Sequence, residues 1–238
     1  QIAAAALGVG CDQVVVREPS TARVPDSGPT VASRTCMVVG AVVERAAAGL
    51  RRRVEAWAAG TGARAGGLGA AAIAMVAAGA DGTAGGEVAE TAQYQPPPGV
   101  QWDDATYTGS AYPVYGWAAC VVDVAVDLDT WEIAIERCVH AVDVGKAIHP
   151  IIVKGQIEGG TLQALGWGHL ERVSYRDGRV ANRTMTNCIV PTFADTPDLE
   201  TILVEEPYPY GPHGAKGVGE IPMDGPAAAL ASAVEDAL

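Results

Sequence analysis

Basic residues are scarce in this sequence, and long apolar runs are absent from it. Its 238 residues include 16 lysines and arginines against 28 aspartates and glutamates, which gives a formal charge of −12. Because nucleic-acid binding needs a basic face, nucleic acid is excluded as the main partner. No apolar stretch reaches the roughly 20 residues that cross a bilayer, so we expect no membrane span. Hydrophobic residues make up 49% and charged residues 18%, which is typical of globular proteins.

Sequence motifs for metal and nucleotide binding are also lacking. The five cysteines form no C-x-x-C pair, and the four histidines do not have the spacing of metal ligands. We therefore expect no metal-ligating side chains, and we interpret the cysteines as reduced thiols of a cytoplasmic protein. There is no G-x-x-x-x-G-K-[ST] phosphate loop, and "GVGCDQ" (8–13) lacks the strand–turn–helix setting of a dinucleotide fingerprint.

Two hydrophobic periodicities alternate along the chain. Apolar residues recur every three or four positions from about 35 to 59, which predicts a long amphipathic helix. Strict alternation over Val122–Leu128, resumed at Ile133–Ile135, predicts a β-hairpin with one buried face. Further expected elements are strands at Val14–Val16 and 199–205, a hairpin around Asp177–Gly178, and helices near 70–78, from near Gln156 and over 226–238. Strands and helices mix without a strict βαβ rhythm, so the predicted class is α+β.

The chain opens on "QIAAAALGVG", which has the composition of a helix that ends at Gly8. An opening inside a helix leads us to expect that an upstream part is missing or lies on another chain.

The segment "GPTVASRT" (28–35) stands directly before the long predicted helix. A helix N-terminus carries unpaired N–H groups and the positive end of the helix dipole, and both favour anions. Thr30, Ser33 and Thr35 add hydroxyl groups and Arg34 adds a fork-shaped cation, so the segment suits a phosphate or pyrophosphate. Ordinary N-capping by serine or threonine explains the same residues, and the sequence leaves both readings open.

Two later loops could share a ligand with that segment. In "GQIEGG" (155–160), Gln156 offers an amide donor and acceptor to the edge of a heterocycle, or else faces solvent. In "GAKGVGE" (214–220), glycines at 214, 217 and 219 indicate special backbone angles or a close backbone approach to something. A glutamate held on such a loop inside a cleft, here Glu220, is a candidate general base. The alternative for Glu220 is a solvated surface residue.

Taken in order and at their separations, "PTVASRT", "GQIEGGTLQALGWG" and "GAKGVGEIP" resemble the molybdenum-binding subunit of the xanthine dehydrogenase and aldehyde oxidase family. "AYPVYGWAACVVDVAVDLDT" and "AVDVGKAIHP" are similar to that family too. The resemblance covers nearly the whole chain and is weakest over 58–90. It implies the C-terminal half of the molybdopterin-binding domain, with a first part over 1–90 and a second part over 91–238.

The resemblance also implies residue roles. Glu220 matches the glutamate beside the metal that acts as general base, and Gly219 matches the backbone that passes close to it. Gln156 matches a glutamine that contacts the pterin. The segment that holds the pterin and its phosphates is matched by Thr30, Val31, Ala32, Ser33, Arg34 and Thr35. The implied cofactor is molybdopterin with molybdenum, in the cytosine dinucleotide form usual in bacterial members, and its pyrophosphate would explain Arg34.

Departures from the family pattern concern both the pocket and the missing parts. His149 stands where the family usually has asparagine, and Val31 replaces a smaller residue. The family's upstream half, iron–sulfur cysteines and flavin domain are absent from this sequence. The implied partners are therefore an N-terminal molybdopterin subunit, an iron–sulfur subunit and an FAD subunit. The implied reaction is hydroxylation of an N-heteroaromatic compound or an aldehyde with water as the oxygen source; a non-catalytic scaffold subunit is the alternative.

Overall fold

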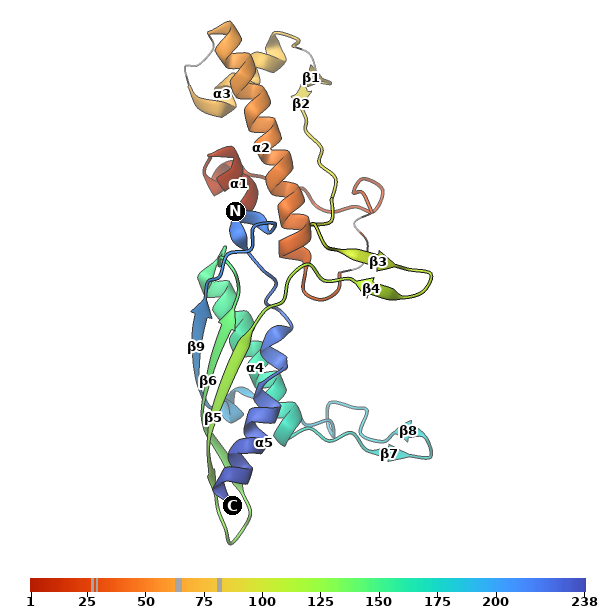
Figure 1. Ribbon diagram of the computed structural model, residues 1–238, viewed down its shortest axis with the longest axis vertical. Coiled ribbons are helices and arrows are strands. Elements are labelled where there is room, and N and C mark those ends of the chain that lie inside the picture. The colour runs from red at the N-terminus through yellow and green to blue at the C-terminus, as the bar shows by residue number, and fades with distance from the viewer. Residues whose placement is uncertain (27, 29, 63–65, 81–82) are drawn as a thin grey trace. The chain divides into compact units, whose positions relative to one another are not determined.

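The computed structural model describes residues 1–26, 28, 30–62, 66–80 and 83–238, and the chain forms two compact units (Figure 1). Unit 1 comprises Gln1–Pro113 together with Pro209–His213, and unit 2 comprises Val114–Tyr208 together with Gly214–Leu238. The sequence motifs divided the chain at residue 90, whereas the compact units divide after Pro113. That motif-based division stays a prediction about cofactor binding.

Unit 1 is built on one long helix. α2 (Thr35–Thr61) confirms the helix predicted from the apolar period, and α1 (Ile2–Leu7) ends at Gly8, whose φ of 71° is left-handed, as the opening segment predicted. α3 (Gly67–Ala77) packs on the later part of α2. The core between these two helices consists of Val54, Ala58, Ala71 and Met75. Alanine at two of these positions lets the helices approach closely, because a small side chain keeps the backbones near one another.

α1 and the returning segment 209–213 both pack on α2. A Cβ atom at Gly40 would lie 2.9 Å from Ile2 Cδ1 and 2.9 Å from Pro212 Cγ, so only glycine admits both contacts. His213 has a left-handed φ of 50°, and its Nδ1 lies 2.9 Å from Glu44 Oε1. The returning segment is thereby fastened to α2.

Two small sheets complete unit 1. Their strands are β1 (Thr83–Ala84), β2 (Glu87–Val88), β3 (Gln101–Asp103) and β4 (Thr108–Ser110). The β3–β4 pair follows three consecutive prolines at 96–98, and the rings of Trp102 and Tyr107 pack edge to face with their centroids 4.9 Å apart. The strand predicted at Val14–Val16 is wrong. That segment follows the short 3-10 helix η1 (Cys11–Gln13) as irregular chain, with Val15 83% and Val16 89% exposed.

Unit 2 contains a three-stranded sheet. β5 (Ala118–Val126) and β6 (Ile133–Asp143) pair antiparallel, with a bulge between Asp123 and Val124, and confirm the predicted hairpin. β9 (Asp198–Val204) pairs parallel with β6 and confirms the predicted strand. A parallel pair requires a crossover connection, and α4 (Pro150–His169) lies within it.

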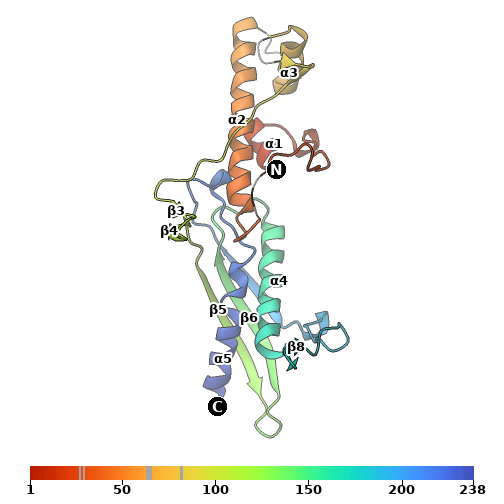
Figure 2. The same ribbon diagram turned by 90° about the vertical axis from the view of Figure 1, so that its right-hand side faces the viewer.

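Two helices cover one face of this sheet (Figures 1 and 2). α4 and α5 (Pro226–Ala237) enclose a core with the sheet that contains Val122, Cys138, Leu165 and Leu230. α4 begins at Pro150 rather than near Gln156, because His149 caps it: His149 Nδ1 accepts the Ile152 N–H at 3.3 Å. The sequence reading missed this cap, since histidine is not a usual N-cap residue.

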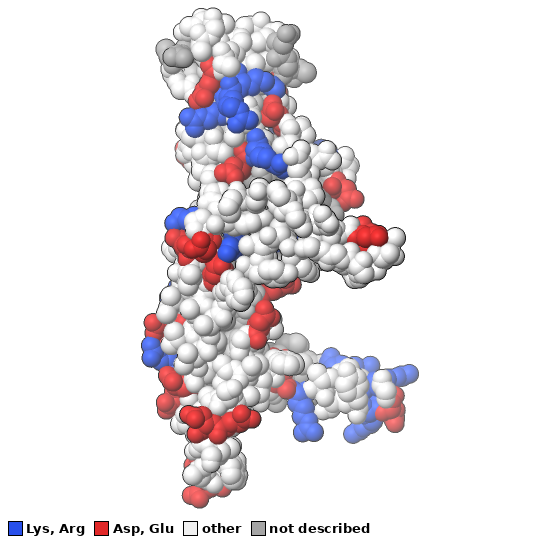
Figure 3. All heavy atoms as spheres, viewed as in Figure 1, with Lys and Arg blue, Asp and Glu red and all other residues white. Residues whose placement is uncertain are grey.

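The segment 172–183 after α4 contains a short hairpin and four of the eight lysines and arginines of unit 2 (Figure 3). β7 (Tyr175–Arg176) and β8 (Arg179–Val180) are joined by the predicted turn, in which Asp177 and Gly178 have φ values of 50° and 72°. The two units together mix helices with small sheets and confirm the α+β class. Within the described residues, none of the helices combines the length and apolar character that crossing a membrane requires.

Candidate functional site

The loop that carries Glu220 is attached to the turn after β6 by backbone hydrogen bonds. Lys216 N donates to Val144 O at 3.0 Å, and Lys146 N donates to Gly214 O at 2.9 Å. A Cβ atom at Gly145 would lie 2.3 Å from Gly214 O, so the two segments can approach only because position 145 is glycine. Gly214 itself has a left-handed φ of 91°. These bonds fix the start of the Glu220 loop.

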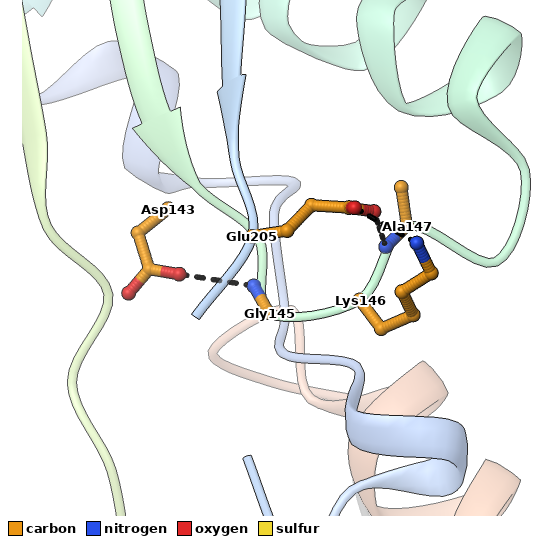
Figure 4. A network of polar contacts seen from close by, with 5 residues as sticks. All are labelled: Asp143, Gly145, Lys146, Ala147 and Glu205. Carbon is orange, nitrogen blue, oxygen red and sulfur yellow. Dashed lines mark hydrogen bonds and ion pairs between the residues drawn. The ribbon is translucent and has the colours of Figure 1, made fainter. Parts of the chain in front are cut away.

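A buried ion pair joins the same two segments. Lys216 Nζ lies 2.5 Å from Asp143 Oδ2, and the side chains are only 8% and 6% exposed. Asp143 Oδ1 also accepts the Gly145 N–H at 3.0 Å, which Figure 4 shows. Asp143 thereby orients this turn. The partnership with Lys216 was not predicted.

A second, exposed ion pair holds the other side of the turn (Figure 4). Glu205 Oε2 lies 2.8 Å from Lys146 Nζ, and Glu205 Oε1 accepts the Ala147 N–H at 2.9 Å. The hydrogen bond from Lys146, followed by the one from Ala147, lowers the pKa of Glu205. The carboxylate is thus ionised at neutral pH and serves as a fixed acceptor for the turn.

Downstream of the buried ion pair, apolar contacts hold the loop. Val218 and Ile221 pack against a core of Val142, Val144, Ala147 and Ile157. Pro222 is buried in the short 3-10 helix η4 (Ile221–Met223), and it fills the space above Gly160 of α4, where a Cβ atom would lie 2.8 Å from Pro222 Cβ. Glycine at 160 therefore lets the loop and α4 pack closely.

Glu220 lies between these anchored residues and is exposed. Within the described part of the chain, its carboxylate forms no hydrogen bond or ion pair, so it is available to a ligand or to solvent. The expectation of special backbone angles holds for Gly214 alone: Gly217 and Gly219 are not among the described residues with positive φ. The close backbone approach at Gly219 stays a prediction.

Gln156 lies on α4, in the same unit as Glu220. Its side chain is exposed and makes no hydrogen bond to the described residues. Gln156 and Gly160 are one helical turn apart and so lie on one face of α4, the face on which Pro222 packs. Gln156 therefore lies on the helix against which η4, the short helix directly after Glu220, packs.

The segment before α2 belongs to unit 1. Ala32 and Ser33 have left-handed φ values of 53° and 49°, and Arg34 N donates to Val31 O at 3.3 Å. No described side chain caps α2, which begins at Thr35. Ordinary N-capping by serine or threonine, the alternative left open by the sequence, is therefore wrong for this helix. The remaining predicted residue of the segment, Thr30, is exposed.

An uncapped helix start with a strained turn is suited to an anion. The first N–H groups of α2 have no side-chain acceptor among the described residues, and the helix dipole adds positive potential there. Ser33 is half-buried and Arg34 is exposed, so a hydroxyl and a guanidinium flank the N–H groups. These groups can bind a phosphate. No three His, Cys, Asp or Glu side chains of the described residues gather as a metal-ligand set.

A hollow of about 460 Å³ opens elsewhere in unit 2. It lies between the start of β6, the C-terminal end of α4 and the segment 191–197. None of the predicted site residues lines it. The candidate site is thus not this hollow but the exposed surface around the Glu220 loop and α4.

Comparisons with known proteins identify the family of the chain. The family model of the molybdopterin cofactor-binding domain matches residues 1–197. A probable xanthine dehydrogenase component of Bacillus subtilis (strain 168) is 31% identical over 250 residues, which cover 100% of this chain and 32% of the relative. The carbon monoxide dehydrogenase large chain of Hydrogenophaga pseudoflava is 32% identical over 160 residues, which cover 63% of this chain and 19% of the relative.

Solved structures agree with these sequence matches. Quinoline 2-oxidoreductase from Pseudomonas putida 86 is 31% identical, with a TM-score of 0.80 over 100% of this chain and 31% of its own. The Cu,Mo-CO dehydrogenase is 25% identical, with a TM-score of 0.81 over 99% of this chain and 30% of its own. This chain spans about a third, 32%, of the length of the Bacillus subtilis relative.

Proposed function

The chain belongs to the family of molybdopterin cofactor-binding domains, and we propose that it forms part of the molybdenum-binding subunit of a cytoplasmic hydroxylase. In this proposal Glu220 is the general base of the reaction. The observation that carries it is an exposed carboxylate without a partner among the described residues, on a loop whose two ends are anchored in unit 2. A merely solvated glutamate needs no such anchoring.

The residues of this chain fit the proposed cofactor. The uncapped start of α2, with Thr30, Val31, Ala32, Ser33, Arg34 and Thr35, would hold the phosphates, and Gln156 would hydrogen-bond the pterin. Arg34 favours the cytosine dinucleotide form, because a guanidinium can bind a pyrophosphate through two parallel hydrogen bonds. When bound, the cofactor supplies a redox-active molybdenum centre that accepts two electrons from the substrate.

The proton chemistry would come from Glu220. An ionised carboxylate next to an oxidisable substrate can accept the proton of the water-derived hydroxyl group that becomes part of the product. Glu220 has no competing hydrogen-bond donor among the described residues, so its lone pairs are available for this step. Gly219 precedes it and places no side chain between the loop and the cofactor.

The substrate and the partners are also proposals. We propose an N-heteroaromatic substrate, supported by the likeness to quinoline 2-oxidoreductase over the whole chain; an aldehyde is the alternative. The chain spans 32% of its Bacillus subtilis relative, so the remainder of the molybdenum subunit would be supplied by an N-terminal part. Iron–sulfur and FAD subunits would carry the electrons away.

The experiment that tests this function is Glu220→Gln in the assembled complex. The amide keeps the size of the side chain but cannot accept the proton, and general-base assistance is worth about 10²–10⁴-fold. We expect turnover per bound molybdenum to fall by that factor at an unchanged molybdenum content. Glu136→Gln, an exposed glutamate of β6, is the matched control and should not change turnover.

Two outcomes would contradict the proposal. Equal turnover per molybdenum in Glu220→Gln and wild type would show that Glu220 is not the base. A wild-type complex that contains no molybdenum by elemental analysis would instead support the scaffold alternative.

A further inference from the structure

The Asp143–Lys216 pair is unusual because both charges are buried. Their side chains are 6% and 8% exposed, and the charged atoms lie 2.5 Å apart. Removing two charges from water is costly, and an apolar pair of similar volume is often as stable or more stable. Stability of unit 2 alone therefore does not account for this pair. A buried ion pair can instead select one local arrangement of the chain.

The pair connects the Glu220 loop to the turn after β6. Lys216 is held twice on the turn after β6, through its side chain to Asp143 and through its backbone N–H to Val144 O at 3.0 Å. Asp143 is in turn fixed by the Gly145 N–H. An apolar side chain at 216 could slide within the packing, whereas the ammonium group has one acceptor at a defined position.

Glu220 follows Lys216 by four residues, and its backbone O accepts the Met223 N–H at 2.9 Å. Its carboxylate has no hydrogen bond or ion pair to the described residues that could orient it. Downstream, Pro222 is seated over Gly160 of α4. Between these two points the backbone is held by the partly buried Val218 and Ile221. The backbone that carries Glu220 is thus held by anchors on both sides, and Lys216 is the anchor with a charged partner at a defined position.

We propose that the Asp143–Lys216 ion pair is a positioning device for Glu220. Neither residue touches the substrate; the pair fixes the loop so that the carboxylate stays aimed at the reacting proton. The inference rests on the proposed role of Glu220 as base. It adds two residues, 73 positions apart in the chain, to the machinery of that step.

The test uses the double variant Asp143→Asn/Lys216→Met in the assembled complex. Both charges are removed, so no uncompensated charge is buried, and the amide at position 143 can still accept the Gly145 N–H. We expect wild-type molybdenum content, unfolding temperature and KM. Turnover per bound molybdenum should fall at least tenfold, since a misplacement of about 1 Å can cost about 10²-fold in rate.

A second readout does not depend on activity. Hydrogen exchange of the amides from 217 to 220 should be faster in the double variant, because the loop has lost its polar anchor. The matched control is Arg137→Met/Glu200→Gln, which removes an exposed ion pair between β6 and β9 of the same sheet. It should change neither turnover nor exchange in the Glu220 loop.

The outcomes separate this inference from the proposed function. If Glu220→Gln is impaired while the double variant turns over and exchanges like wild type, the positioning role is overturned and the base role stands. Loss of molybdenum or of folding in the double variant also overturns it, because the pair would then be a general stability element. If Glu220→Gln keeps full turnover, the base role fails and the positioning role fails with it.

Discussion

Two loops that carry predicted site residues are built in opposite ways. The loop Gly214–Glu220 of unit 2 is tied to its neighbours by backbone bonds, a buried ion pair and apolar side chains. Among the described residues, the segment Val31–Thr35 of unit 1 has one backbone hydrogen bond within itself, two left-handed residues and a helix start without a side-chain cap. The first loop is organised by its own protein framework, whereas the second leaves backbone donors for a ligand to satisfy.

This difference separates two tasks of the proposed function. A base must be aimed before the reaction begins, because proton transfer depends on distance and direction. A phosphate-binding segment can acquire its last contacts from the ligand, since the phosphate supplies the missing acceptors. We therefore expect mutations in the framework of unit 2 to act on folding and turnover, and mutations before α2 to act on cofactor retention.

The largest effect is expected for Ile157→Ala. Ile157 is 0% exposed in the core that supports the Glu220 loop, and such a truncation leaves a cavity that costs about 2–5 kcal/mol of unfolding free energy. Urea denaturation of the protein, followed through the unfolding of unit 2, measures this loss. Ile152→Ala on the same helix is the control: Ile152 is 59% exposed, so its effect should stay within about 0.5 kcal/mol. Equal effects of the two changes would mean that α4 does not support this core.

The other half of the comparison is tested by Arg34→Ala. A charge-assisted hydrogen bond to phosphate is worth about 1.5–3 kcal/mol, which corresponds to roughly 10- to 150-fold weaker retention of the cofactor. Pterin release from the assembled complex measures this directly. Arg52→Ala is the control, because Arg52 is an exposed arginine of the same helix, well beyond its first turn. If both variants retain the cofactor equally, Arg34 merely faces solvent.

The sequence predicted most of the regular elements because their signals are local. The apolar period gave α2 within two residues of its observed end, and alternation gave the β5–β6 hairpin. The same reasoning failed at Val14–Val16, where a β-branched run remains exposed and irregular. A strand requires a partner strand elsewhere in the chain, and propensity contains no information about that partner.

The sequence indicated which residues are candidates for the site, but not the contacts that hold them. Glycines around Glu220 and hydroxyls before α2 are visible in the sequence, whereas the contact of Lys216 with Asp143 spans 73 positions and has no local signature. The left-handed angles of Ala32 and Ser33 were also unpredictable, because neither residue type favours positive φ. Such angles are imposed by their surroundings and mark positions where the backbone is strained.

A smaller effect is expected from His140, which tests whether the framework of unit 2 is sensitive to pH. His140 is 1% exposed, its Nδ1 lies 2.8 Å from Thr161 Oγ1, and its Nε2 has no partner among the described residues. Burial lowers the pKa of His140 below its usual 6.5. As the pH falls below that value the unfolded chain binds the proton first, so the stability of unit 2 should be complete above pH 6.5 and decline below it.

The slope of this decline cannot exceed about 1.4 kcal/mol per pH unit for one proton. Urea denaturation of wild type and His140→Gln at several pH values between about 5 and 7 isolates the contribution, because the amide does not titrate there. His169→Gln, which changes an exposed histidine of α4, should leave the slope unaltered. A His140→Gln slope that matches wild type would assign the pH dependence to other groups.

The smallest effect is expected for Ala32→Gly, and its sign is the informative part. Ala32 has a φ of 53°, a conformation that costs an L-residue about 1–2 kcal/mol and glycine almost nothing. Against this gain, glycine increases the conformational entropy of the unfolded chain, which lowers the free energy of unfolding by about 0.4–1 kcal/mol. The net result is a stabilisation of unit 1 by about 0 to 1.6 kcal/mol.

The control for Ala32→Gly is Ala56→Gly, at an exposed position inside α2. It should destabilise by about 1 kcal/mol, because there glycine only adds entropy to the unfolded state. Opposite signs in thermal unfolding would show that the turn before α2 is strained without its ligand. If Ala32→Gly also retains the cofactor less well, the strained turn holds the N–H groups in position for a phosphate. If both variants destabilise alike, the left-handed turn is not the conformation in solution, and the contrast between the two loops disappears.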